Sequence, residues 1–335
     1  IFPIETLRKA GELGFCGLYT PEDVGGLGLS RLDSSIIFEQ LAKGCTATTA
    51  MLTIHNMATW MISDFGSTVT RQTYGEKLTS GEWLASYCLT ESSSGSDAAA
   101  LSTKALLDGD HYVITGNKAF ISGAGETDVL VVMARTGGAG SKGISAFVVN
   151  ADSDGISYGR KERKMGWNAQ PTRTINFDCV RVPIENLLGQ EGEGFAIAMK
   201  GLDGGRINIA TVGIGTAQQA MEDALTYVNE RKQFGKPIGS FQLQQKKLAE
   251  MITEITKAQL LAWRLGALRN EDKATSAQIS MAKRNNVEMA LKIARKARQI
   301  LGGMGITGEY SIMRHMMNLE SVLCFLMILI ECCIL

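Results

Sequence analysis

The sequence predicts a multidomain α+β protein with an N-terminal α-helical domain, a middle antiparallel β-barrel or β-sandwich, and a C-terminal four-helix bundle. The main observation is that the hydrophobic period changes along the chain, from about 3.6 to about 2 and back to about 3.6. The length supports it as well, because 335 residues are too many for one simple core. With 45% apolar residues, the chain can bury a sizeable interior.

The N-terminal domain, taken as residues 1–82, has helical periodicity in four segments. We expect helices over residues 2–14, about 31–44, 49–64 and 68–79. A glycine-rich loop at Gly25–Gly28 separates the first two.

The middle domain, residues 83–190, changes to short runs of period two. Asp-Gly and Gly-Gly turns separate these runs, which cover residues 105–107, 111–115, 129–134, 144–149, 156–159 and 173–177. The third domain, residues 191–322, returns to helical periodicity over residues 193–230, 242–269, 274–301 and about 308–320. Segments of this length favour a bundle over βαβ crossovers.

Charge and composition exclude several classes of function. Lys+Arg and Asp+Glu balance at 34 each, so the sequence predicts no nucleic-acid partner and no membrane partner. The 3 histidines lie far apart and lack metal-ligand spacing, so no metal site is expected. The 7 cysteines are odd in number and show no CxxC pair, which indicates reduced thiols in an intracellular protein.

Both ends of the sequence are unusual. The chain begins at Ile1 inside a helical pattern, so we expect that upstream sequence is missing. Residues 323–335 form an atypical apolar tail that is too short to span a bilayer. We expect the last part of the bundle to be truncated or altered there.

The segment Tyr87–Asp97 is the first candidate site. A strand-like run ends in a turn of serines and glycines, and so little side-chain bulk lets a flat or phosphorylated ligand approach the backbone. Taken alone, such a turn is more often a surface loop. The strand end Phe120–Ser122 offers an aromatic ring that could stack on a planar ligand, although a buried strand end fits it equally well.

Three helical segments also allow two interpretations. Arg231 ends a helix, where a cation suits a phosphate or simply the helix dipole. Gln299–Gly303 is either a glycine C-cap or backbone open to a ligand. Glycines within Gly201–Arg206 cost helix stability, about 1 kcal/mol each, so a packing or ligand reason is expected.

In order along the chain, these segments resemble the acyl-CoA dehydrogenase family over about residues 1–322. The resemblance rests on YCLTE and SGSD within 87–97, and on the segments Lys118–Glu126, Met165–Arg173, Val182–Phe195, Glu230–Ile238 and Ala297–Tyr310. Up to about residue 270 the chain is most similar to the isobutyryl-CoA (short branched-chain) subfamily. From about residue 280 it is more similar to the glutaryl-CoA subfamily.

The resemblance implies an FAD-dependent oxidoreductase that acts on a CH–CH bond. Such an enzyme converts a short, branched acyl-CoA to the 2-enoyl-CoA by abstraction of the α-proton and hydride transfer to flavin N5, in fatty acid or branched-chain amino acid catabolism. It also implies a homotetramer that passes electrons to an electron-transferring flavoprotein. The expected location is the mitochondrial matrix in a eukaryote or the cytoplasm in a bacterium.

The resemblance also implies which residues form the site. The flavin ring and ribityl chain would contact Tyr87, Leu89, Thr90, Gly95, Ser96, Phe120, Ile121 and Ser122. The pyrophosphate and adenosine end, from a neighbouring subunit, would contact Arg231, Phe234, Gln242, Gln299, Gly302 and Gly303. The acyl-CoA channel would be lined by Ser96, Asp203, Gly204, Gly205 and Arg206.

The sequence departs from the family at the catalytic base. The family's glutamate follows an arginine that matches Arg314 and corresponds to a position within Leu323–Leu326, where no residue is acidic. Glu320 comes too early and is expected to be an ordinary helix residue, and Gly205 stands where some relatives carry the base instead. The alternatives are therefore a catalytically impaired protein that binds flavin or acyl-CoA, and a scaffold without flavin. Ser92-Ser93 also replaces the Pro-Gly that the family usually has, so a less rigid turn is expected.

Overall fold

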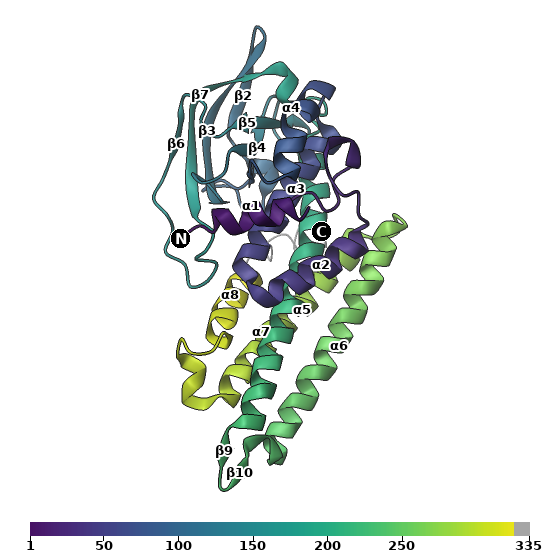
Figure 1. Cartoon of the computed structure of the whole chain (residues 1–335). Coiled ribbons are helices and arrows are strands. Elements are labelled where there is room, and N and C mark those ends of the chain that lie inside the picture. The colour runs from purple at the N-terminus through teal and green to yellow at the C-terminus, as the bar shows by residue number, and fades with distance from the viewer. Residues whose placement is uncertain (325–335) are drawn as a thin grey trace. The chain divides into compact units, whose positions relative to one another are not determined.

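A computed structural model of the protein describes residues 1–324, which contain helices α1–α8 and strands β1–β10 (Figure 1). This part of the chain divides into two compact units. The first contains residues 1–30, 51–163 and 168–205, and the second contains residues 31–50, 164–167 and the chain from residue 206. No helix within residues 1–324 is both long and apolar enough to cross a membrane.

The first unit contains helices and one large β-sheet. The helices are α1 (Ile4–Glu12), the part of α3 (Thr46–Phe65) from Met51 onward, α4 (Thr68–Thr79) and the part of α5 (Gly194–Glu230) up to Gly205. Ser67 begins α4 by accepting a hydrogen bond from the Thr70 amide at 3.1 Å. The helices expected before residue 80 are therefore confirmed to within a few residues.

The sheet of the first unit has eight strands. They are β1 (Ala85–Cys88), β2 (Lys104–Asp108), β3 (His111–Ser122), β4 (Val129–Arg135), β5 (Ile144–Asn150), β6 (Ile156–Tyr158), β7 (Thr172–Pro183) and β8 (Leu187–Leu188). Their order is β6-β7-β3-β2-β4-β5-β8, and β1 pairs with β4.

Most strand pairs are antiparallel, as expected, but β1 and β2 each pair with β4 in parallel. Within the described residues the two ends of the strand order, β6 and β8, do not pair. Of the two expected forms, barrel or sandwich, the described residues do not form a closed barrel, and the α+β architecture is confirmed. The physical reason is that period two specifies which face of a strand is buried, but not whether the edge strands meet.

The sheet is buried on both faces at its centre. Leu130, Val132 and Ala134 of β4 belong to one apolar cluster, and the alternate residues of this strand are equally buried. His55 of α3 connects this region to the helices, because its Nε2 donates to the Leu78 carbonyl at 2.9 Å and its Nδ1 accepts from the Ala85 amide at 3.0 Å. Both contacts suit a neutral ring, and burial lowers the pKa of His55 to about 4.

The second unit is helical. It contains α2 (Arg31–Gly44), the first part of α3 up to Ala50, the later part of α5 (Gly194–Glu230), the hairpin of β9 (Lys232–Gln233) and β10 (Lys236–Pro237), α6 (Gln242–Asn270), α7 (Ser276–Ile300) and α8 (Ile312–Cys324). Thr275 begins α7 with a capping box that includes Gln278. The four helices expected after residue 190 are confirmed as α5–α8.

Short 3₁₀ turns occur in the loops of both units. They are η1 (Glu22–Val24), η2 (Ala98–Ala100), η3 (Ser141–Gly143), η4 (Ile184–Asn186), η5 (Ile238–Ser240) and η6 (Gly302–Ile306). The described cysteines Cys16, Cys45, Cys88, Cys179 and Cys324 are all free thiols.

Candidate functional site

The structure brings together two of the predicted flavin-binding segments, the end of β1 and the end of β3. The Ala119 amide donates to the Thr90 carbonyl at 2.8 Å, and the Lys118 ammonium donates to the Leu89 carbonyl at 3.0 Å. Leu89 is buried, and Thr90 is half-buried at the edge of this contact. These hydrogen bonds join residues that are about 30 positions apart in sequence within the first unit.

The serine-glycine turn after β1 is closed by its own backbone. Glu91 and Ser94 exchange two backbone hydrogen bonds of 2.9 and 3.2 Å, and the Ser94 hydroxyl donates to the Asp97 carbonyl at 2.6 Å. Nothing lies within 4 Å of the position that a Cβ atom would take at Gly95. The turn thus keeps a defined shape without the Pro-Gly pair that was expected to stiffen it, and its glycine leaves open space.

Phe120 has an unusual backbone conformation at the end of β3. Its φ is 55°, in the left-handed region, and its side chain is 66% exposed. The pairing of β3 with β7 shifts register between Lys118 and Ile121, so Phe120 lies in a β-bulge. Because a left-handed aromatic residue costs about 1–2 kcal/mol, this strain marks a candidate functional position.

Ser122 and Tyr87 lie near the same strand ends and have polar atoms of different kinds. The Ser122 hydroxyl accepts from the Gln170 amide nitrogen at 3.0 Å, so its own hydrogen can be donated to a ligand. The Tyr87 hydroxyl is buried without a hydrogen-bond partner. Exposed aromatic surface, a spare hydroxyl donor and an open glycine are what a flat heteroaromatic ring requires, so this part of the first unit fits a flavin.

The predicted residues of the second unit lie at helix ends. Arg231 follows the last residue of α5, and its carbonyl accepts from the Ile238 amide at 2.9 Å across the hairpin. Phe234 has φ 53° and is 93% exposed, and its ring meets that of Phe241 edge to face at 6.1 Å. Gln242 is the exposed first residue of α6. An arginine, an aromatic ring and an amide are thus presented at one helix junction.

The turn after α7 is also open to solvent. Gln299 is exposed near the end of α7, and Gly302 has φ 59°. Nothing lies within 4 Å of the Cβ positions of Gly302 and Gly303. Figure 1 shows the end of α7 and the hairpin toward the same end of the helical unit. The left-handed glycine ends the helix and leaves free space above the backbone, so both interpretations of this turn fit.

Two glycines inside α5 lie close to methionines of α3. A Cβ atom at Gly201 would lie 1.8 Å from the methyl carbon of Met61, and one at Gly205 would lie 3.3 Å from the sulfur of Met57. Arg206, which follows in the same helix, is only 2% exposed. Gly201 therefore lies close against α3, and Asp203–Arg206 stays a predicted substrate segment.

The predicted position of the missing base is only partly described. Leu323 and Cys324 end α8, whereas residues 325 and 326 lie outside the described residues. Glu320 forms an ion pair with Arg295 of α7. Glu320 is therefore an ordinary partner on the helix surface, as expected.

Sequence reasoning did not select Glu91 and Lys118 as site residues. Their side chains form a salt bridge of 2.8 Å and are 2% and 0% exposed. The sequence did contain a clue to both residues. Glu91 ends the motif YCLTE, and Lys118 begins the motif KAFISGAGE at a buried position of β3.

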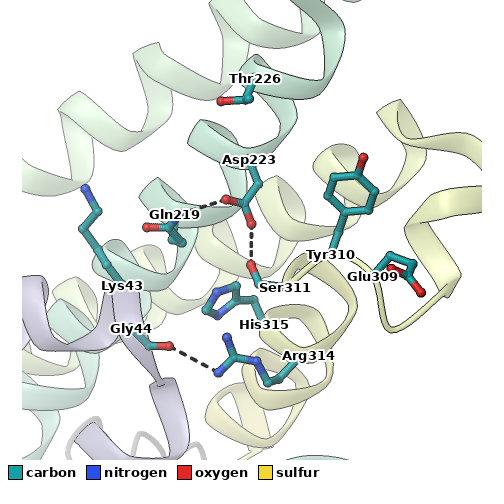
Figure 2. A pocket seen from close by; sticks show the side chains of 10 residues that line it. All are labelled: Lys43, Gly44, Gln219, Asp223, Thr226, Glu309, Tyr310, Ser311, Arg314 and His315. Carbon is teal, nitrogen blue, oxygen red and sulfur yellow. Dashed lines mark hydrogen bonds between the residues drawn. The ribbon is translucent and has the colours of Figure 1, made fainter. Parts of the chain in front are cut away.

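A pocket of about 510 Å³ in the second unit is separate from these residues (Figure 2). Figure 2 shows Asp223 accepting hydrogen bonds from Gln219 and Ser311, and Arg314 donating to the Gly44 carbonyl. His315 is buried beside them, and its pKa is lowered to about 4, mainly by burial. None of the predicted flavin or substrate residues lines this pocket. Within residues 1–324, no group of three or more His, Cys, Asp or Glu side chains could hold a metal.

Three family models match successive parts of the chain. They describe the N-terminal domain of acyl-CoA dehydrogenase at residues 1–82, the middle domain at residues 86–180 and the C-terminal domain at residues 192–323.

Individual relatives give the same result. The chain is 48% identical to the mitochondrial isobutyryl-CoA dehydrogenase of Bos taurus over 316 residues, which are 94% of this chain and 76% of that protein. It superposes on butyryl-CoA dehydrogenase from Megasphaera elsdenii with a TM-score of 0.93 and 35% identity, over 97% of this chain and 86% of that one. A glutaryl-CoA dehydrogenase from Mycobacterium smegmatis in complex with FADH2 superposes with a TM-score of 0.91 and 32% identity, over 97% of this chain and 83% of that one.

Proposed function

Because the chain belongs to the acyl-CoA dehydrogenase family, whose members are FAD-dependent oxidoreductases, we propose that it dehydrogenates a short, branched acyl-CoA such as isobutyryl-CoA. The observation that supports this most is the contact between the ends of β1 and β3. It brings the Thr90 side chain and the exposed Phe120 ring to neighbouring strand ends. The family matches do not support the alternative of a catalytically impaired binding protein.

The first unit would hold the ring part of the cofactor. Phe120 offers a ring face for stacking, and the hydroxyls of Thr90 and Ser122 offer hydrogen bonds to the polar edge of the flavin. Tyr87, Leu89, Gly95, Ser96 and Ile121 would complete this wall. The bound flavin supplies the chemistry that this chain lacks, acceptance of the substrate's β-hydrogen as hydride.

The second unit of a neighbouring subunit would hold the charged part of the cofactor. The Arg231 guanidinium balances pyrophosphate charge and can bind two oxygens at once. Gln242 and Gln299 add amide donors, and Phe234 offers a second ring face. The open backbone at Gly302 and Gly303 lets the nucleotide approach without meeting a side chain.

The substrate would bind along Ser96 and Asp203–Arg206. Hydrogen bonds to the thioester carbonyl stabilise the negative charge that develops when the α-proton leaves. A carboxylate must accept that proton in a site from which water is excluded. The residues at 323–326 include no carboxylate, and we assign the base to no other residue.

The partners follow from the same proposal. We expect reduced enzyme to pass electrons to an electron-transferring flavoprotein and the chain to assemble as a homotetramer. Relatives occur in mitochondria and in bacteria, so the matrix or the bacterial cytoplasm is the expected location.

The test is an anaerobic titration of the purified yellow protein. Isobutyryl-CoA is added first, and butyryl-CoA and glutaryl-CoA serve as comparisons of different shape and charge. We expect isobutyryl-CoA to bleach the visible flavin bands fastest. If no saturated acyl-CoA bleaches a flavin that dithionite still reduces, the proposed activity is wrong although the cofactor is bound.

A further inference from the structure

A buried ion pair connects the two proposed flavin-binding segments of the first unit. The Lys118 ammonium lies 2.8 Å from Glu91 Oε1, and the two side chains are 0% and 2% exposed. Glu91 directly follows Leu89–Thr90, and Lys118 directly precedes the bulge that holds Phe120. Both charged groups are therefore adjacent to predicted flavin contacts without being among them.

The Glu91 carboxylate is held by several donors at once. Its Oε2 accepts from the amide and the hydroxyl of Ser102, both at 2.7 Å. Its Oε1 accepts from the Thr103 amide at 2.9 Å and from Lys118. Burial opposes ionisation, but Lys118 and these hydrogen bonds prevail and lower the pKa of Glu91 to about 2. The carboxylate thus has a fixed charge and a fixed position.

Lys118 extends this connection to the backbone before Glu91. Its ammonium donates to the Leu89 carbonyl at 3.0 Å as well as to Glu91, and the neighbouring Ala119 amide donates to the Thr90 carbonyl at 2.8 Å. Residues 89, 90 and 91 are therefore each bonded to the Lys118–Ala119 segment of β3. The position of Phe120 relative to Thr90 depends on these contacts.

A buried ion pair is a poor means of stabilising a fold. Removing two charges from water costs several kcal/mol each, and replacing such a pair with apolar residues is often neutral or stabilising. What a hydrogen-bonded pair provides instead is a defined geometry, because its contacts are directional.

We propose that Glu91 and Lys118 are positioning residues that hold Leu89–Thr90 and Phe120–Ser122 in the relative position that binds the flavin ring. This inference rests on the proposed function, since the two segments are flavin contacts only there. A purely structural pair would contribute stability without affecting the bound cofactor.

The test uses the FAD-loaded protein and a double variant, Glu91→Gln with Lys118→Met. It removes both charges together and keeps the side-chain lengths, so no unpaired charge stays buried and the variant is expected to fold. Ile114→Ala is the matched control, because Ile114 is fully buried in the same strand, and its truncation destabilises the sheet without touching the pair. Ser102→Ala is a milder variant that removes one hydrogen bond to Glu91 from an exposed residue.

Three readouts are compared: the FAD dissociation constant, the visible spectrum of bound flavin, and amide hydrogen exchange of the peptide containing Ala119. The double variant should bind FAD about tenfold more weakly, equivalent to about 1.4 kcal/mol, with shifted flavin bands and faster exchange. Ser102→Ala should change all three less and in the same direction. Ile114→Ala should unfold more easily yet keep the spectrum and the affinity.

Two results would contradict different claims. Wild-type affinity and spectrum in the double variant would overturn the positioning role alone, as would equal flavin effects in Ile114→Ala. Failure of the wild-type protein to bind FAD would overturn the proposed function and the inference together.

Discussion

The strained backbone of Phe120 leads to a prediction that separates stability from cofactor binding. In Phe120→Gly, the left-handed conformation with φ 55° becomes unstrained, which gains about 1–2 kcal/mol. The substitution also loses about 0.5–1 kcal/mol, because glycine has more freedom in the unfolded chain. Since the ring is 66% exposed, the loss of its buried third costs about 0.5–1 kcal/mol more. These contributions nearly cancel, so the free energy of unfolding should change by less than about 1 kcal/mol.

FAD binding should respond differently. An aromatic stacking contact contributes about 0.5–1.5 kcal/mol, so the loss of the ring should raise the FAD dissociation constant roughly two- to tenfold. The assay pairs thermal unfolding of the apoprotein with FAD titration by flavin fluorescence.

Cys179→Gly provides the matched control. Cys179 has φ 52° at the other register shift of the same β3–β7 pair, and it is exposed. It should gain stability from the same relief of strain while FAD binding stays unchanged. The reasoning is refuted if Phe120→Gly binds FAD as tightly as wild type, or if Cys179→Gly weakens binding equally.

Three further predictions concern packing, pH and catalysis. A Cβ atom at Gly215 would lie 1.8 Å from the Glu39 carbonyl oxygen, whereas one at Gly213 meets only an ordinary contact at 3.5 Å. Gly215→Ala should therefore lower the free energy of unfolding by about 1–3 kcal/mol, and Gly213→Ala should raise it by up to about 1 kcal/mol, as measured by urea denaturation. His55 and His315 have pKa values of about 4 when folded and an ordinary value of 6.5, so the unfolded chain binds more protons between these limits. Stability should fall as the pH drops from 6.5 to 4, by on the order of 3 kcal/mol for each ring, and His55→Gln should reduce that slope in denaturation curves at stepped pH. Leu326→Glu places a carboxylate at one of the positions where the resemblance implies the base. Stopped-flow reduction of the bound flavin by isobutyryl-CoA should be about 10²–10⁴-fold faster in this variant than in wild type. Leu326→Gln is the uncharged control. An equal rate in all three proteins would mean that the base comes from elsewhere.

Local patterns predicted the secondary structure well, because helix and strand periods depend on residues that are close in sequence. The expected helix at residues 68–79 is α4, and the expected helix at about 31–44 is α2. The parallel pairing of β1 with β4 was not predictable in this way. It joins residues about 40 positions apart, and the sequence of a strand does not specify which other strand it pairs with.

Side-chain partners were the harder part of the site. The glycine at 201 suggested either packing or a ligand, and its closeness to the Met61 side chain could not be read from the sequence. Lys118 shows the same limit, since a lysine in a strand is normally assigned to the solvent face. Its burial follows from Glu91, a residue whose proximity depends on how β1 and β3 meet.

Backbone strain adds a structural observation to the motifs that carry the family resemblance. Among residues 1–324, the residues other than glycine with a left-handed backbone are Phe120, Trp167, Cys179, Phe234 and Asp272. The first, second and fourth lie in the motifs KAFISGAGE, MGWNAQPTR and ERKQFGKPI, which carry the family resemblance. Each is aromatic, and the left-handed conformation costs an aromatic residue more free energy than it costs the aspartate. Strain of that kind persists where the surrounding structure imposes it, and it concentrates at binding and catalytic sites. The coincidence of strain, ring and motif therefore supports Phe120 and Phe234 as ligand contacts, and it identifies Trp167, held by a hydrogen bond from its amide to Asn318, as the next aromatic position to substitute.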